Sequence, residues 1–254
     1  MAFKTLFLVL SFLCLYVQAQ PKQDKEIRIM TYNIHHGADS DGKLNLSNIG
    51  SIIQENNLDI VFLQEVDYNV SRSGNKNQSL LLGAQTQLMP LFGKAISLNR
   101  GAYGVALLSK YNVLKSEVHK LPHTSSTEQR VALESILALP CGKRIRVINA
   151  HLTHVSETLR SKQLAYIQKL VHDEIPTILS GDLNALPQEV RKNMPQWKFT
   201  NKAKDTTYPA LNPQDKIDYI LIDSPHNWHV ISSKVVDRPE ASDHLPLISV
   251  LKLN

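Results

Sequence analysis

Cysteine is scarce in this sequence, and its absence limits the kinds of site that the chain can build. Two cysteines in 254 residues exclude a small scaffold held by several disulfides. There is no cysteine cluster and no His-Glu-x-x-His stretch, so zinc is not favoured. The formal net charge is only +5, and no dense Lys/Arg cluster with interleaved aromatic residues indicates nucleic-acid binding. No Pro/Gly/Ser-rich linker, repeat or low-complexity run divides the chain, which predicts one domain.

A single strongly apolar run stands at the start of the chain. A short positive segment ending at Lys4 precedes "TLFLVLSFLCLYV", which is too short to span a bilayer comfortably, and small or modest residues follow in "VQAQ". We predict a signal peptide over residues 1–19, cut after Ala19, and a domain over residues 20–254. The mature protein would be exported, to the periplasm or beyond, without stable membrane insertion. It would keep Cys141 alone and carry a charge of +4, because Lys4 is removed.

Short β-rich runs alternate with amphipathic helical segments along the rest of the chain. Several of the runs are apolar on both faces, which indicates sheets covered by other layers. Helical spacing of apolar residues predicts helices within residues 45–57 and 158–174. The pattern predicts an α/β protein with helices outside its sheets. The expected strands are residues 26–34, 59–66, 103–110, 131–139, 144–152, 176–183, 216–223 and 244–253.

Polar residues gather where these expected strands end. One such stretch is "LSGDLNALP", in which Asp182 and Asn184 would share a face if the strand continued through them; Gly, Asp, Asn and Pro equally favour a turn there. Burial of carboxylates and histidines near apolar strands is costly unless they are paired or bind a metal. Their joint occurrence therefore predicts a functional site. The residues at these ends are Asn33, Glu65, Asn149, His151, Asp182, Asn184, Asp218, Asp243 and His244.

The inventory of these side chains suits one kind of chemistry. Oxygen ligands from Glu65, Asn33 and Asp243 suit a hard divalent cation such as Mg²⁺, with Mn²⁺ as a substitute. An aspartate beside a histidine supplies a base and the group that orients it, and Asn or His side chains supply donors to an oxyanion. The set predicts metal-assisted phosphoryl transfer to water.

Seven motifs in order, "TYNIHHG", "LQEVD", "EQRVAL", "NAHLTH", "GDLN", "KIDYI" and "SDHLP", resemble the endonuclease/exonuclease/phosphatase superfamily, to which deoxyribonuclease I belongs. The resemblance covers about residues 27–252 and suggests an exported, bacterial-type member. It implies a four-layer α/β/β/α sandwich, with two central, mostly antiparallel sheets, helices outside and an active site at one edge.

The resemblance also implies a role for each matching residue. Glu65 resembles the principal Mg²⁺ ligand, Asn33 a ligand or ligand-orienting amide, and Asp243 a carboxylate beside the metal. The catalytic residues implied are Asp182 for positioning or deprotonating water, Asn184 as a transition-state donor, Asp218 as partner of His244, and His151 as a phosphate-contacting or acid histidine. Arg130 matches a phosphate-binding arginine, and Arg100 is a further candidate to reach the phosphate, whereas Tyr103 is either near the site or a core residue.

The substrate does not follow from fold and motifs, because members share the chemistry and differ in the loops that hold the substrate. The favoured hypothesis is a monomeric phosphodiesterase or phosphatase acting on a lipid headgroup or another small phosphoester. The alternative is a secreted DNA or RNA endonuclease, which would carry more Lys and Arg along a groove. A third hypothesis, an inactive binding module, predicts loss of Glu65, Asp182 or His244, and all three are present.

Overall fold

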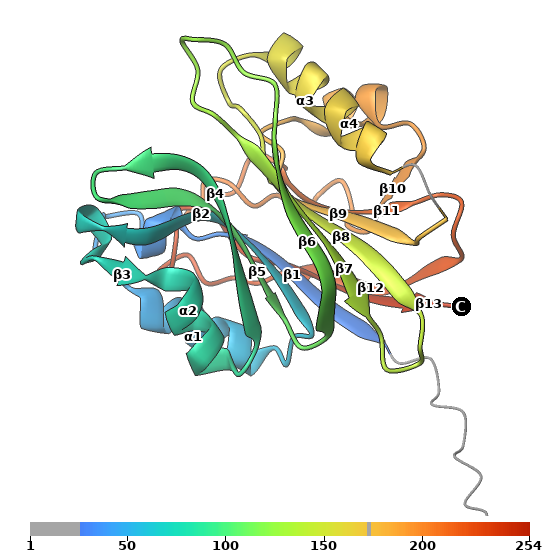
Figure 1. Cartoon of the computed structure of the whole chain (residues 1–254), viewed down its shortest axis with the longest axis horizontal. Coiled ribbons are helices and arrows are strands. Elements are labelled where there is room, and N and C mark those ends of the chain that lie inside the picture. Colours follow the sequence, from blue (N-terminus) through green and yellow to red (C-terminus); the bar gives the residue numbers. More distant parts are fainter. Residues whose placement is uncertain (1–25, 172–173) are drawn as a thin grey trace, which may run out of the picture.

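A computed structural model describes residues 26–171 and 174–254, and it contains two β-sheets packed face to face with helices outside (Figure 1). The predicted signal peptide lies outside the described residues. None of the helices described is long and apolar enough to cross a membrane. The seven-stranded sheet contains, in spatial order, β12 (Trp228–Val235), β13 (Leu247–Leu253), β1 (Ile27–Asn33), β2 (Ile60–Val70), β5 (Gly101–Ser109) and β4 (Met89–Leu98), with β3 (Lys76–Asn77) beside β2.

The second sheet has six strands and lies against the first. In spatial order these are β10 (Trp197–Phe199), β11 (Asp218–Asp223), β9 (Thr177–Asp182), β8 (Arg144–His151), β7 (Val131–Ala138) and β6 (Asn112–Lys120). Both sheets are mostly antiparallel, with one parallel pair each, β1 with β2 and β8 with β9. The predicted sandwich of two central sheets is therefore confirmed.

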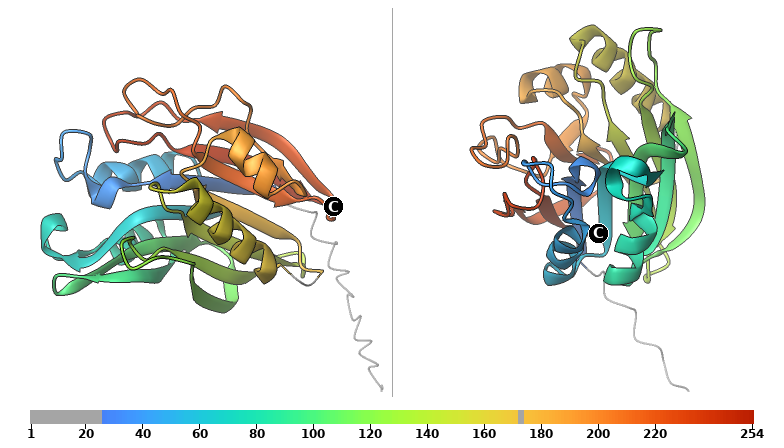
Figure 2. Two further views of the ribbon diagram at one scale, coloured as in Figure 1. Left: turned by 90° about the horizontal axis from the view of Figure 1, so that it is seen from above. Right: turned by 90° about the vertical axis from the view of Figure 1, so that its left-hand side faces the viewer.

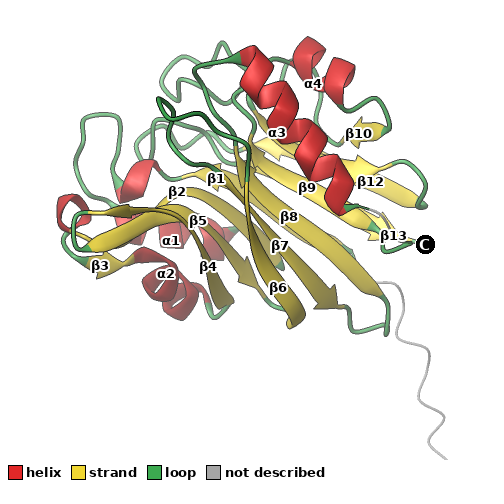
Figure 3. Cartoon of the chain, turned by 45° about the horizontal axis from the view of Figure 1, so that its top comes forward, coloured by secondary structure: helices red, strands yellow, loops and turns green. Residues whose placement is uncertain are grey.

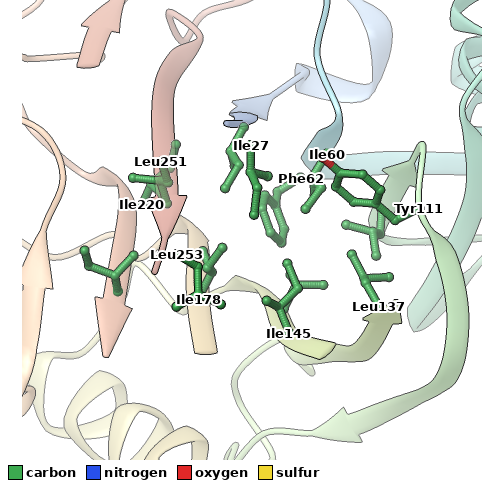
Figure 4. Close-up of a cluster of buried hydrophobic side chains, with 14 of the residues drawn as sticks. Ile27, Ile60, Phe62, Tyr111, Leu137, Ile145, Ile178, Ile220, Leu251 and Leu253 are labelled. Atoms are coloured by element: carbon green, nitrogen blue, oxygen red, sulfur yellow. The ribbon is translucent and has the colours of Figure 1, made fainter. Parts of the chain in front are cut away.

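The apolar core lies in three layers, which explains why the inner strands are apolar on both faces. Between the sheets, Phe62 and Leu251 of the first sheet pack in one cluster with Ile145 and Ile178 of the second (Figure 4). A second cluster joins the first sheet to α1 (Leu46–Glu55) and α2 (Gln78–Thr86). A third joins the second sheet to α3 (Glu157–Leu170) and α4 (Pro187–Asn193). The helices thus cover the two outer faces (Figure 2, Figure 3).

The main differences from the sequence-based prediction lie at the edges of the sheets. All eight expected strands and both expected helices are present, with bounds shifted by a few residues. The long strands β4, β6 and β12 were missed because most of their residues are exposed or half-buried, so the apolar signal is weak. Helices α2 and α4 were also missed; each is shorter than three turns.

Candidate functional site

The register of the strands brings the predicted site residues to one edge of the sandwich. In the second sheet, Asp182 at the end of β9 pairs with His151 on one side and with Asp218 on the other. In the first sheet, Asn33 ends β1 beside Gln64 of β2. The side chain of Asn33 then reaches across to the second sheet, so both sheets contribute to one cluster.

Gly181 in "GDLN" allows β9 to approach β8 closely. It has a φ of +144°, and a Cβ atom placed on it would lie 1.9 Å from the carbonyl oxygen of Ala150. No other residue type fits without moving β8. This close approach places His151 and Asp182 side by side at the strand ends.

Asn33 links two carboxylates of the site. Its amide nitrogen donates to Glu65 Oε1 at 3.2 Å and to Asp182 Oδ2 at 3.0 Å. Its amide oxygen accepts the backbone N–H of His35 at 3.1 Å. Two carboxylates need a donor and a backbone N–H needs an acceptor, so these contacts fix the orientation of the amide. Of the two roles expected for Asn33, this arrangement favours the ligand-orienting one.

Glu65 is aimed at the site by a β-bulge. Leu63 pairs with Ala106 and Val66 pairs with Gly104, so Gln64 and Glu65 together lie opposite one residue of β5. Glu65 has a φ of +56°, which is costly for a residue with a side chain and is typical of functional positions. The residue is half-buried, and its carboxylate accepts a hydrogen bond from Asn33.

His244 and Asp218 form a buried hydrogen-bonded pair. The Nδ1 atom of His244 lies 2.9 Å from Asp218 Oδ2, and its Nε2 atom lies 3.8 Å from Asp182 Oδ2. Asp218 also accepts a hydrogen bond from the hydroxyl of Thr207 at 2.5 Å. The ring of Tyr208 packs on the His244 ring with centroids 4.7 Å apart. The contacts predicted for this pair are present, and Thr207 and Tyr208 add support that the sequence did not indicate.

The electrostatics of this group set which side chain carries a proton. Burial, followed by the negative charge of Asp218, raises the pKa of Asp182 to about 7. Burial acts to lower the pKa of His244, but Asp218 and Asp182 outweigh it, and the pKa of His244 is raised to about 10. At neutral pH the structure therefore favours a charged imidazolium at His244 beside an ionisable carboxyl at Asp182.

His151 and Arg130 lie on the other side of Asp182. His151 Nε2 is 3.5 Å from Asp182 Oδ2, and Arg130 Nη1 is 2.7 Å from His151 Nδ1. Both side chains are buried, Arg130 being 7% exposed. The structure thus brings the predicted phosphate-binding arginine into the cluster, in contact with a histidine.

Asn184 does not continue the strand. It has a φ of +48°, and its backbone N–H donates to Asp182 Oδ1 at 2.9 Å, which is the turn geometry that the sequence also allowed. Its amide nitrogen donates to the Leu152 carbonyl at 3.0 Å. Asp182 and Asn184 therefore do not share a strand face, although the turn keeps both beside the end of β8.

Asp243 lies near the cluster, whereas Arg100 is not brought into it. The carboxylate of Asp243 is 3.9 Å from His35 Nδ1 and 3.3 Å from the hydroxyl of Ser242, which donates to the Asn33 carbonyl. Arg100 is in the exposed turn between β4 and β5, and within the described part of the chain it has no hydrogen bond or ion pair to the site. Ser242 could have been found, since it belongs to "SDHLP"; Thr207 lies in "TTYPALNPQDKIDYI", a segment that resembles one in bacterial members but assigns it no role.

The donor set fits a divalent metal ion. Asp182, Asp218 and His244 offer ligand atoms that all lie within 4.8 Å of one another, so they form a possible metal-binding group. Glu65 adds a partly exposed carboxylate that shares the Asn33 amide with Asp182. This group of oxygen atoms suits a hard cation. One of them, Asp218 Oδ1, is buried without a hydrogen-bond partner among the described residues.

Comparisons with known proteins point to one family. A family model described as "Endonuclease/Exonuclease/phosphatase family" matches residues 30–244. Among solved structures, a protein of that description from Bacteroides vulgatus has a TM-score of 0.74 at 23% identity, covering 91% of this chain and 100% of that one. One from Beutenbergia cavernae DSM 12333 has a TM-score of 0.73 at 22% identity, covering 90% and 72%. The human Nocturnin catalytic domain with bound sulfate anion has a TM-score of 0.68 at 23% identity, covering 90% and 94%.

Proposed function

This chain belongs to the endonuclease/exonuclease/phosphatase family, and from this premise we propose that it hydrolyses a lipid headgroup ester or another small phosphoester with Mg²⁺. As a member of the family it is a metal-dependent phosphoester hydrolase. The observation that carries the mechanism is the pairing of Asp182 with the Asp218–His244 couple at the sandwich edge. We also propose that the chain acts as a monomer after export.

The metal would bind at Glu65, with Asp243 and the Asn33 amide beside it. The neighbouring group of Asp182, Asp218 and His244 would not hold it at neutral pH, because a protonated His244 ring has no lone pair to offer a metal. Asn33 holds Glu65 and Asp182 through one amide group, so the position of the metal ligand and that of the water-activating carboxylate are coupled. When bound, the cation supplies positive charge to the phosphoryl oxygens. The residues of this chain supply the remaining functions.

Asp182 is the proton acceptor in this mechanism. His244 is already protonated at neutral pH because Asp218 raises its pKa, so it cannot also take the proton of water. Asp182, with a pKa of about 7, is ionised in a large fraction of molecules and can accept that proton. The imidazolium of His244 then faces the site as a charged hydrogen-bond donor, and Asn184 and His151 flank the same carboxylate.

Support for a small substrate comes from the charge of the chain. The formal net charge is small, and the buried arginine at the site, Arg130, is already in contact with His151. A polynucleotide backbone would be expected to meet a longer series of Lys and Arg side chains.

A substrate panel tests this proposal. The purified protein is incubated with Mg²⁺, Mn²⁺ or EDTA and with sphingomyelin, glycerophospholipids, inositol phosphates, plasmid DNA and RNA, with Glu65→Ala as control. Turnover of a lipid or small phosphoester that is absent in EDTA and in Glu65→Ala supports the proposal. Metal-dependent cleavage confined to DNA or RNA would make the protein a nuclease and overturn the choice of substrate.

A further inference from the structure

Arg130 lies immediately before β7, and His151 is the last residue of β8. These strands are antiparallel neighbours with Ala132 opposite Ala150, so the start of β7 lies beside the end of β8. The backbone at Arg130 is fixed, because its carbonyl accepts the N–H of Leu121 at 2.9 Å and the amide of Gln129 at 2.7 Å. The arginine side chain therefore starts from a rigid position.

The contact between Arg130 and His151 determines where the histidine carries its proton. A guanidinium group has only donors and stays charged at every accessible pH. Nη1 of Arg130, 2.7 Å from His151 Nδ1, must therefore be the donor, and Nδ1 must offer its lone pair. A histidine that accepts at Nδ1 is neutral and carries its hydrogen at Nε2. That Nε2 atom is the one 3.5 Å from Asp182 Oδ2.

We propose that Arg130 is a positioning residue that holds His151 as the neutral tautomer protonated at Nε2, with this N–H directed at Asp182 and the substrate phosphoryl group. The part concerning the substrate rests on the proposed function, whereas the tautomer does not. A neutral N–H donates a hydrogen bond but has no spare proton to release. Of the two roles expected for His151, phosphate contact is therefore retained and general acid is not.

The surroundings of both side chains agree with this assignment. Nε of Arg130 is 3.3 Å from Glu128 Oε1, so the guanidinium is held between Glu128 and His151. Burial, and then the charges of Arg130 and His244, lower the pKa of His151 well below its usual value. The titratable and charged groups that act on the ring are thus Arg130, His244, His154 and the Asp182 carboxyl.

Nuclear magnetic resonance of the ring nitrogens tests the tautomer without any substrate or metal. The protein is labelled with ¹⁵N at its ten histidines, and the His151 signals are assigned by their loss in His151→Gln. We expect an unprotonated Nδ1 and a protonated Nε2 that do not change between about pH 5 and pH 8. A His151 ring protonated at Nδ1, or at both nitrogens, at neutral pH would overturn the proposal.

Arg130→Met tests whether the arginine is the cause. We expect His151 in this variant to titrate as the pH falls and to lose its fixed tautomer, while Arg144→Met, at the exposed start of β8, leaves His151 unchanged. An unchanged His151 tautomer in Arg130→Met would overturn the proposal. If Arg130→Met does not fold, the measurement on the wild-type protein still decides the tautomer.

Kinetics with an artificial phosphodiester and Mg²⁺ separate positioning from direct phosphate binding. A positioning role predicts that Arg130→Met lowers kcat about 10- to 100-fold with little change in KM. A raised KM at unchanged kcat, with the His151 tautomer intact, would show a direct phosphate contact and contradict the proposal. Absence of any turnover by the wild-type protein would count against the proposed function alone, because the resonance result is independent of it.

Discussion

Gln64 donates a hydrogen bond of 2.8 Å from its side-chain amide to Asn149 Oδ1, across the interface between the two sheets. Asn149 in turn donates to the carbonyls of Leu63 and Ala106 at 3.0 and 2.8 Å. These carbonyls lie at the β-bulge that aims Glu65. A fully buried polar connection thus aligns the sheet carrying Glu65 with the sheet carrying His151 and Asp182.

Asn149→Leu is expected to destabilise the protein strongly. The change leaves the Gln64 amide and two carbonyls buried without their partner, and each such group costs about 1–3 kcal/mol. We expect the free energy of unfolding, measured by urea titration, to fall by at least about 3 kcal/mol. The matched change Asn112→Leu, at the exposed start of β6, should alter it by less than about 0.5 kcal/mol. Equal effects of the two changes would refute a connecting role for Asn149.

The pH dependence of activity follows from the pKa values at the site. Because Asp182 must lose its proton to act as a base, kcat/KM should rise with pH through about 7. Because His244 acts while charged, kcat/KM should fall as the pH approaches about 10. Asp218→Asn removes the anion that raises the pKa of His244, so its falling limb should move to lower pH. A falling limb that stays in place in Asp218→Asn would contradict the assignment.

Asp218 and His244 are expected to act as one unit. We predict that Asp218→Asn and His244→Ala each lower kcat by about 10²- to 10⁴-fold. The double variant should have a kcat only slightly below that of the less active single variant. Steady-state kinetics of the wild-type protein, the two single variants and the double variant provide this comparison as a double-mutant cycle. Independent, multiplying losses would mean that the hydrogen bond between them does not matter for catalysis.

Metal removal should abolish activity and lower thermal stability. EDTA is expected to stop turnover, and Mg²⁺ or Mn²⁺ should restore it and raise the melting temperature, because an ion that binds only the folded state stabilises it. Glu65→Gln should weaken both responses, whereas Glu117→Gln, on exposed β6, should keep them. A melting temperature that rises equally in Glu65→Gln would place the ion elsewhere.

The inner strands and the residues at their ends could be predicted from the sequence because burial on both faces produces apolar runs, and the polar residues that end them are conspicuous. The strand register places Asp182 beside Asp218, and the packing of the two sheets brings Asn33 to Asp182. The contacts of Arg130 and Thr207 could not be predicted. Each depends on how a loop or a neighbouring strand is placed in three dimensions, and neither side chain has a local pattern that shows its partner.

The positive φ of Glu65 could not be predicted from the sequence either, because a β-bulge that contains no glycine has no characteristic residue pattern. The apolar signal of β4, β6 and β12 is weak for another reason. Each of these strands lies at the edge of its sheet, where many side chains contact solvent and can be polar. The bulge at the site and the outer strands were thus missed for different physical reasons: the bulge has no residue signature, and the outer strands have little apolar periodicity.

The position of β13 has a consequence for when the enzyme becomes active. This strand, which ends at Leu253, lies between β1 and β12, and the segment leading into it carries Asp243 and His244. A chain still being made therefore lacks this interior strand of the first sheet, and at earlier stages it also lacks His244, the proposed charged donor. We expect hydrolysis to begin only once synthesis has passed residue 253.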